Sequence, residues 1–67
     1  MRYYFETKHQ DRYTGLITMQ DGRVMEYKHV RGPNGLEPYL MDTETGEVYP
    51  VVVVVSDGET EIYVTEV

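Results

Sequence analysis

Three side chains in the N-terminal half are of types that bind metal ions: His9, Asp11 and His29. Imidazole nitrogens and carboxylate oxygens are common zinc ligands, but protein zinc sites hold their ligands at short, regular spacings and often use cysteine. The chain has no cysteine and no His-x-His pair to strengthen the pattern. Two exposed histidines near loop ends explain these residues more simply. The sequence therefore predicts no metal ion and no cofactor.

The residues that could support catalysis are equally sparse. Twelve carboxylates are present, but acid–base catalysis needs one held in a deep cleft, and 67 residues leave little room for such a cleft. Ser56 is the only serine and precedes an aspartate, with no histidine beside it to activate its hydroxyl. The glycines fit neither a Walker loop nor a dinucleotide-binding fingerprint. We expect that the protein is not an enzyme.

Charge is distributed unevenly along the chain. All six Lys and Arg residues lie within residues 1–34, whereas residues 35–67 contain eight acids and no cation, and the net charge is −6. Attraction to phosphate supplies most of the affinity of non-specific nucleic-acid binding, so an acidic chain is poorly suited to it. The asymmetry is typical of internal charge pairing and solubility, and we expect no nucleic-acid partner.

Aromatic residues and methionines are interleaved with cations in the N-terminal half. Tyr, Phe, Met and Arg are enriched at the centres of protein–protein contacts. Side-chain alternation along the strands sends Tyr4 and Leu16 away from the core, and cations flank them. The predicted partner-binding residues are Tyr4, Arg12, Leu16, Arg23 and Lys28. The alternative is that the aromatics only fill the core, because a small all-β core depends on them for buried area.

The elements that position these residues are predicted to be strands. Alanine is absent, whereas Val, Ile and Thr fill nineteen positions and eight residues are aromatic, which is typical of pleated surfaces. Turn signals every eight to twelve residues separate the strand candidates. These candidates are Arg2–Lys8, Tyr13–Gln20, Arg23–Val30, Leu36–Asp42, Glu47–Ser56 and Thr60–Glu66. Short links predict one all-β domain (1–67), a six-stranded antiparallel meander forming a small closed or partly open barrel of SH3-like or OB-like size.

The turn residues also predict strand register. A three-residue turn at Gln20–Gly22 would pair Ile17 with Met25, and a loop at Thr43–Gly46 would pair Leu40 with Tyr49. A type I′ turn at Asp57-Gly58 would pair Val53 with Ile62, and Gly32–Gly35 carries proline at its second position. The link Lys8–Arg12 has neither glycine nor proline and is the least defined.

The strand Glu47–Ser56 contains five consecutive valines, so it is predicted to be buried on both faces while it bends through the barrel. That run is too short to span a bilayer, and the opening residues lack the pattern of a signal peptide. We expect no membrane association and a monomer. The predicted core residues are Tyr3, Phe5, Ile17, Met25, Tyr27, Leu40, Val51, Val53, Val55, Ile62 and Val64.

Residues 32–67 resemble computationally designed (de novo) small all-β mini-proteins. The turns Gly32–Gly35, Asp42–Val48 and Ser56–Glu61 look chosen one per loop, in the manner of idealised designs. The resemblance implies a non-enzymatic β-barrel that is either a bare scaffold or a module that binds one protein partner through its N-terminal strands.

The N-terminal half departs from this style, because Tyr3-Tyr4, His9-Gln10 and several methionines are unusual choices for stability alone. Such residues would fit a surface shaped against a target. The alternative is a small acidic phage-type inhibitor that binds a host enzyme by mimicking nucleic acid. Its contact residues would be Glu37, Asp42, Glu44, Glu47, Glu59 and Glu61.

Overall fold

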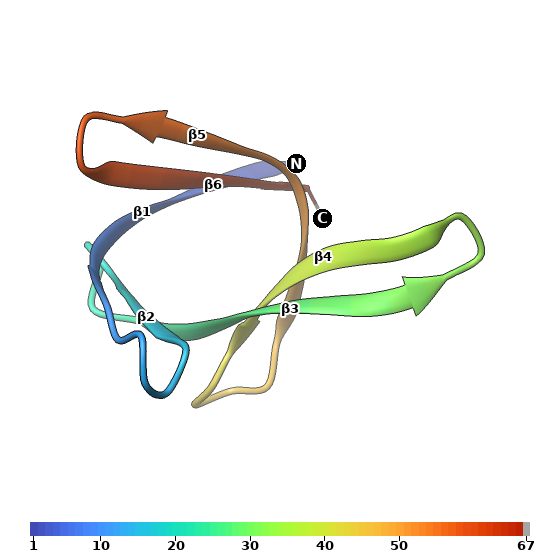
Figure 1. The fold of residues 1–67 in the computed structure, drawn as a ribbon, viewed down its shortest axis with the longest axis horizontal. Coiled ribbons are helices and arrows are strands. Elements are labelled where there is room, and N and C mark those ends of the chain that lie inside the picture. Colours follow the sequence, from blue (N-terminus) through green and yellow to red (C-terminus); the bar gives the residue numbers. More distant parts are fainter. Residues whose placement is uncertain (67) are drawn as a thin grey trace.

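The computed structural model describes residues 1–66, which form six antiparallel strands and no helix (Figure 1). The strands are β1 (Arg2–Gln10), β2 (Leu16–Met19), β3 (Val24–Gly32), β4 (Gly35–Asp42), β5 (Val48–Asp57) and β6 (Thr60–Glu66). Each strand pairs with the next in sequence, and β6 pairs with β1 to close the barrel. The predicted all-β meander and its closure are therefore confirmed.

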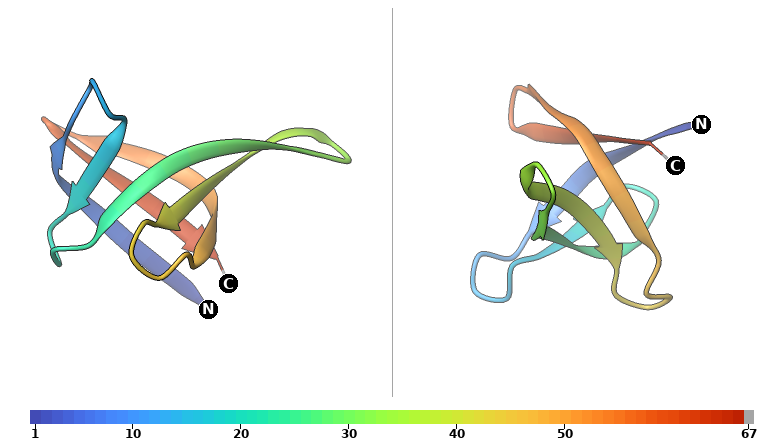
Figure 2. Two further views of the ribbon diagram at one scale, coloured as in Figure 1. Left: turned by 90° about the horizontal axis from the view of Figure 1, so that it is seen from below. Right: turned by 90° about the vertical axis from the view of Figure 1, so that its right-hand side faces the viewer.

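Two bent strands make the closure possible (Figure 2). The first part of β1 pairs with β6 and its end pairs with β2, with a bulge between Thr7 and His9. In the same way β5 pairs with β4 up to Pro50 and with β6 from Val51 onward, with a bulge between Val51 and Val53. A bulge bends a strand and increases its twist, and the missing N–H of proline is tolerated where one ladder ends and another begins.

The link between β1 and β2 is a tight turn over Asp11–Gly15. The Asp11 carboxylate accepts hydrogen bonds from the backbone N–H groups of Tyr13 (2.8 Å) and Thr14 (3.3 Å), and Gly15 has a φ of 77°. The prediction placed this link at Lys8–Arg12 and began the second strand at Tyr13, which is wrong. The aspartate side chain holds residues 12–14 in a turn, so β2 begins only at Leu16.

The link between β4 and β5 repeats this geometry. The Asp42 carboxylate accepts hydrogen bonds from the backbone N–H groups of Glu44 (2.9 Å) and Thr45 (3.3 Å), and Gly46 has a φ of 79°. Both turns therefore share the pattern Asp-x-x-Thr-Gly. The predicted pairing of Leu40 with Tyr49 is confirmed.

The two remaining predictions of register differ in outcome. Ile17 pairs with Met25 as predicted, and Gly22 has a φ of 94° at the end of its three-residue turn. The predicted β5–β6 register is wrong, because Asp57 pairs with Thr60 and the turn is centred on Gly58-Glu59. Glycine is the only residue type at positive φ in residues 1–66, which favours a type II′ turn with Gly58 (φ 64°) as its first central residue.

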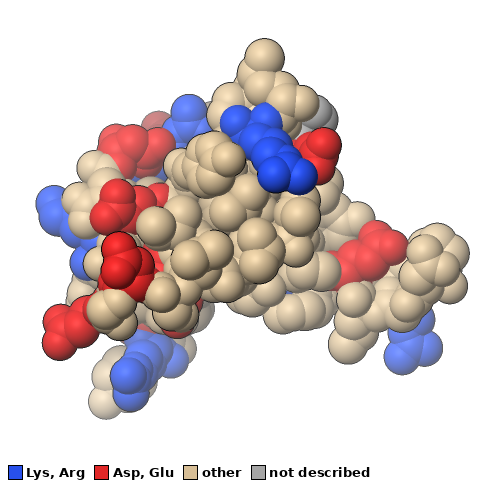
Figure 3. All heavy atoms as spheres, turned by 90° about the horizontal axis from the view of Figure 1, so that it is seen from above, with Lys and Arg blue, Asp and Glu red and all other residues tan. Residues whose placement is uncertain are grey.

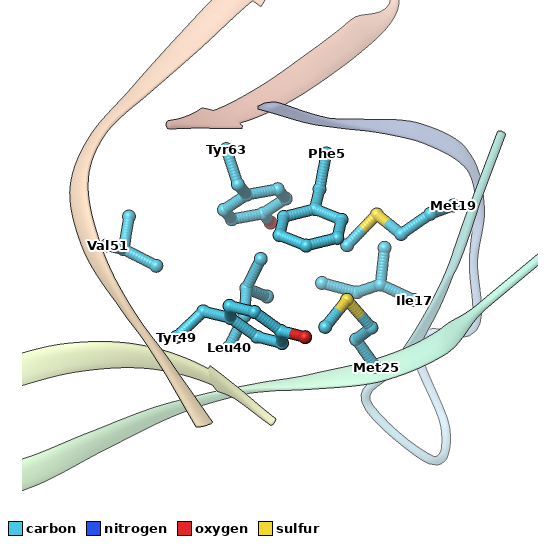
Figure 4. Close-up of a cluster of buried hydrophobic side chains, with 8 residues drawn as sticks. All are labelled: Phe5, Ile17, Met19, Met25, Leu40, Tyr49, Val51 and Tyr63. Atoms are coloured by element: carbon cyan, nitrogen blue, oxygen red, sulfur yellow. The ribbon is translucent and has the colours of Figure 1, made fainter. Parts of the chain in front are cut away.

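The core fills the barrel with aromatic, aliphatic and methionine side chains (Figure 4). Met19, Met25 and Leu40 have no exposed surface. The buried cluster consists of Phe5, Ile17, Met19, Met25, Leu40, Tyr49, Val51 and Tyr63, with Tyr27 and Val54 packed against it. Of the predicted core residues, Phe5, Ile17, Met25, Leu40, Val51 and Val64 are confirmed as buried, and Tyr27 is half-buried against the cluster.

The predicted inner face of β5 and β6 is wrong beyond Val51. Val53 and Val55 are 48% and 45% exposed, whereas Tyr63 and Thr65 are buried. The bulge at Val51/Val53 adds one residue to β5, which moves every later side chain to the opposite face. Two further predictions of the core are wrong, because Tyr3 is 42% exposed and Ile62 is only half-buried. Val64 is buried as predicted, but it lies outside the cluster, on the outer surface of the sheet.

Candidate functional site

The outer side of β1, β6 and β5 carries a continuous group of apolar side chains. Directly opposed residues share a face of a sheet, and Tyr4, Val64 and Val53 lie opposite one another across the three strands. Ile62 and Val55 form the neighbouring row, and Glu6 lies opposite Ile62 at the β1 end of that row. We call the five apolar residues the outer apolar face.

The outer apolar face is open to solvent. Tyr4 is 66% exposed, Val53 48% and Val55 45%, while Val64 lies buried between them. Figure 3 shows an uncharged area over this side of the barrel, with charged groups at its margins. At one end Arg2 and Glu66 form an ion pair at 3.8 Å. The face has no nucleophile or titrating carboxylate at its centre, so what it can do is bury apolar surface against another molecule.

A second feature is a shallow groove on the outer side of β3, β4 and β5. It has a volume of about 270 Å³ and is lined by Lys28, Val30, Tyr39, Met41 and Val48. The Tyr39 hydroxyl donates to Glu37 at 3.0 Å, and this hydrogen bond to a carboxylate raises the tyrosine pKa. The groove is apolar, with the Lys28 ammonium as its charged group.

A third hollow, of about 360 Å³, lies at the β1–β2 turn beside His9, Asp11 and Arg12. Hydrogen bonds from the turn backbone lower the pKa of Asp11, so its carboxylate serves the turn. His29 lies on β3, where its ring packs against Tyr27 with centroids 4.8 Å apart. Residues 1–66 contain no group of three or more His, Cys, Asp or Glu placed to hold a metal ion.

Three tyrosines share a hydrogen bond to a nearby glutamate, which the sequence analysis did not predict. In each Glu-x-Tyr segment the tyrosine hydroxyl donates to the glutamate two residues earlier, on the same face of the strand. The pairs are Glu37/Tyr39 (3.0 Å), Glu47/Tyr49 (2.5 Å) and Glu61/Tyr63 (3.2 Å). The signal was present as three Glu-x-Tyr repeats at the period of a strand.

The environment of these hydroxyls favours the protonated form. Burial, followed by the nearby Glu61 charge, raises the pKa of Tyr63 to about 12. The hydrogen bond to Glu47, followed by burial, also raises the pKa of Tyr49. These tyrosines therefore stay neutral and act as hydrogen-bond donors.

The five predicted partner-binding residues do not form one surface. Tyr4 belongs to the outer apolar face, whereas Leu16 and Lys28 lie on the outer side of β2 and β3. Arg12 lies in the β1–β2 turn. Arg23 donates to the Tyr49 hydroxyl (3.3 Å), and its guanidinium carbon is 5.7 Å from the centre of the Phe5 ring. Arg23 thus packs against core residues at one end of the barrel.

The acidic residues considered for nucleic-acid mimicry are also dispersed. Glu37, Glu47 and Glu61 each accept a tyrosine hydroxyl. Asp42 is buried in the β4–β5 turn, Glu44 lies in that same turn, and Glu59 lies in the β5–β6 turn. These carboxylates occupy separate strands and turns, which is unlike the regular row of a phosphate backbone.

Compared with known proteins, the chain matches no family model, no curated protein sequence and no solved structure. The site is therefore interpreted from its geometry.

Proposed function

We propose that the protein is a non-catalytic binding module that contacts one protein partner through its outer apolar face. The observation that carries the proposal is that Tyr4 on β1 and Val53 and Val55 on β5 are exposed on one face, on either side of the apolar residues of β6. Contiguous exposed apolar surface marks interaction sites, whereas singly scattered apolar residues need no explanation.

The use of aromatic residues supports this proposal. Phe5, Tyr49 and Tyr63 are the aromatic residues of the buried cluster, whereas Tyr3, Tyr4 and Tyr13 are exposed. Of these exposed tyrosines, Tyr4 lies within the apolar face, and tyrosine is one of the residue types enriched at contact centres. A designed β-barrel without a ligand is the second candidate function. It is less well supported, because a scaffold without a partner would gain nothing from the exposure of Tyr4.

The experiment compares two identical substitutions at exposed tyrosines. Wild-type protein, Tyr4→Glu and Tyr13→Glu are immobilised and incubated with a cell extract. Tyr13 is fully exposed in the β1–β2 turn, away from the apolar face, so its variant is the matched control. We expect a partner that wild type and Tyr13→Glu retain and Tyr4→Glu loses. Equal loss in both variants, or no retained protein, would contradict the proposal.

Salt separates this proposal from nucleic-acid mimicry. Screening weakens charge-based binding far more than apolar burial, so retention should be almost equal at about 50 mM and about 500 mM salt. Loss of the partner at the higher concentration, together with insensitivity to Tyr4→Glu, would favour the acidic inhibitor instead.

A further inference from the structure

The hairpin of β3 and β4 extends beyond the barrel as a two-stranded arm (Figures 1 and 2). β3 pairs with β2 only over Val24–Glu26, but it pairs with β4 up to Gly32. On the other side, β4 pairs with β5 only from Tyr39 onward. We call residues 27–38 the β3–β4 arm. Within it, each strand has one edge with no strand beside it among residues 1–66.

The two edges of the arm differ in what they offer. A two-residue hairpin turn makes Gly32 and Gly35 a hydrogen-bonded pair, and bonded and non-bonded pairs then alternate along the ladder. His29 and Pro38 are accordingly a non-bonded pair, whose backbone groups point away from the partner strand. On the β4 edge Pro38 has no N–H, so this edge lacks a hydrogen-bond donor at that position and is less able to pair with another strand.

The β3 edge is open. By the same alternation, Tyr27, His29 and Arg31 direct their N–H and C=O groups away from β4. Their predecessor in this series, Met25, pairs with Ile17 of β2, so the open edge continues the direction of an existing ladder. The chain leaves that ladder at the Asp11–Gly15 turn, before it could pair with Tyr27. Three consecutive edge positions are thus left for another strand.

Charge indicates which strand would fit. Lys28, His29 and Arg31 are exposed cations or titratable groups on this edge, in a protein of net charge −6. Glu37 is the one acid of the arm, and its carboxylate accepts the Tyr39 hydroxyl. A second copy pairing through the same edge would bring two basic edges together, which is unfavourable.

We propose that the open edge of β3 binds an extended, acidic segment of a partner protein by strand addition. The segment hydrogen-bonds to the backbone of Tyr27, His29 and Arg31, and its acidic side chains lie beside the basic residues of the edge. Its side chains on the outer surface lie next to Lys28 and Val30, at the rim of the apolar groove. This site is separate from the outer apolar face and does not depend on the proposed function.

The test uses the whole protein and a short acetylated peptide in which valine and glutamate alternate. We expect the peptide to slow hydrogen exchange of the Tyr27, His29 and Arg31 amides at least about tenfold at saturation, and to leave the Leu36 amide unchanged. A peptide with lysine in place of glutamate should bind at least roughly tenfold more weakly. Equal binding of the two peptides, or protection that appears with protein concentration alone, would overturn the proposal.

Two variants at one position test the backbone contact. His29→Pro removes an N–H that points away from β4, whereas His29→Ala keeps it and removes only the imidazole. The proposal expects at least about tenfold weaker peptide binding for proline and at most about twofold for alanine. Equal affinity in the two variants contradicts strand addition.

A third variant tests the same edge if the His29→Pro protein does not fold. Arg31→Glu reverses one exposed charge of the edge without altering its backbone. It should raise the affinity for the lysine peptide and lower the affinity for the glutamate peptide. An unchanged preference would show that the edge is not where the peptide binds.

Discussion

At the scale of single residues, tyrosine hydroxyls paired with glutamates are the most regular feature of the protein. Tyr39, Tyr49 and Tyr63 each donate to a glutamate two positions earlier. In each pair the tyrosine hydroxyl reaches a carboxylate, while the rings of Tyr49 and Tyr63 pack in the core and that of Tyr39 lines the outer groove. The pairing also ties half of the acidic residues once considered for mimicry to structural roles.

Tyr63 predicts a stability change at high pH. The folded protein keeps the Tyr63 proton until about pH 12, whereas the unfolded chain ionises near its ordinary value of 10. Stability is therefore fully present below pH 10 and is lost as the pH rises from 10 to 12, by at most about 2 to 3 kcal/mol. Denaturant unfolding at a series of pH values measures the slope.

The control for this prediction is Tyr63→Phe, which keeps the ring and removes the ionisable group. Its stability should fall less steeply over the same pH window, with a remaining slope from Tyr39 and Tyr49, whose pKa values are also raised. Identical slopes for the two proteins would show that Tyr63 does not titrate as its burial requires.

The same scale shows why the candidate site was only partly predictable. Tyr4 was recognised because alternation with Tyr3 and Phe5 sends it outward from β1. The sequence predicts Val53 and Val55 in the core because the expected two-residue turn at Asp57-Gly58 places them on one apolar face with Ile62. Five equal valines carry no alternation, so the bulge that reverses their faces leaves no trace in the sequence.

At the scale of the elements, the turns determine how the strands are paired. The Gln20–Gly22 and Thr43–Gly46 turns could be predicted because their chemistry and the apolar pattern of both flanking strands agree. The β5–β6 register could not, since both registers place Val53 opposite a β-branched residue, Ile62 in the predicted one and Val64 in the observed one. The position of the β1–β2 turn could also have been predicted, because Asp11–Gly15 repeats the sequence pattern of Asp42–Gly46.

The repeated turn predicts two unequal effects of one substitution. Asp42 is 6% exposed and Asp11 is half-exposed, yet each accepts two backbone hydrogen bonds. Asp42→Ala should lower the free energy of unfolding by about 1–3 kcal/mol, because it removes a buried carboxylate that accepts both hydrogen bonds of the turn. Asp11→Ala should cost less, because water can replace its carboxylate. Denaturant unfolding measures both.

The asparagine variants distinguish hydrogen bonding from charge in this prediction. Asp42→Asn keeps an oxygen that can accept the same two bonds, so it should cost clearly less than Asp42→Ala. If asparagine and alanine are equally destabilising, the hydrogen bonds of the turn are not the source of the effect.

At the scale of the whole molecule, one strand separates the core from the outer apolar face. Val51 points into the barrel and is 8% exposed, whereas Val53 is 48% exposed on the outside. The bulge between them allows β5 to contribute to both surfaces. The boundary between the core, which stabilises the barrel, and the outer apolar face therefore lies within Val51–Val53.

Matched substitutions test this division. Val51→Ala should lower the free energy of unfolding by about 1–3 kcal/mol, through lost burial and the cavity left behind. Val53→Ala should cost less than about 1 kcal/mol, mostly from the preference of valine for strands. Both are measured by denaturant unfolding. A larger loss at Val53 than at Val51 would mean that the faces of β5 are reversed.

The pairing of β1 with β6 has a consequence for how the barrel opens. Every other ladder joins strands that are adjacent in sequence, whereas this one joins Arg2 to Glu66 near the two ends of the chain. Bringing such distant residues together carries the largest loop-closure entropy in the fold, so opening the barrel along this seam would regain the most chain entropy while breaking the five residue pairs that join β1 to β6. The outer apolar face lies across that seam, with Tyr4 on β1 and Val53 on β5. A molecule bound there would hold the first and last strands together, and its binding energy would add directly to the stability of the closed barrel.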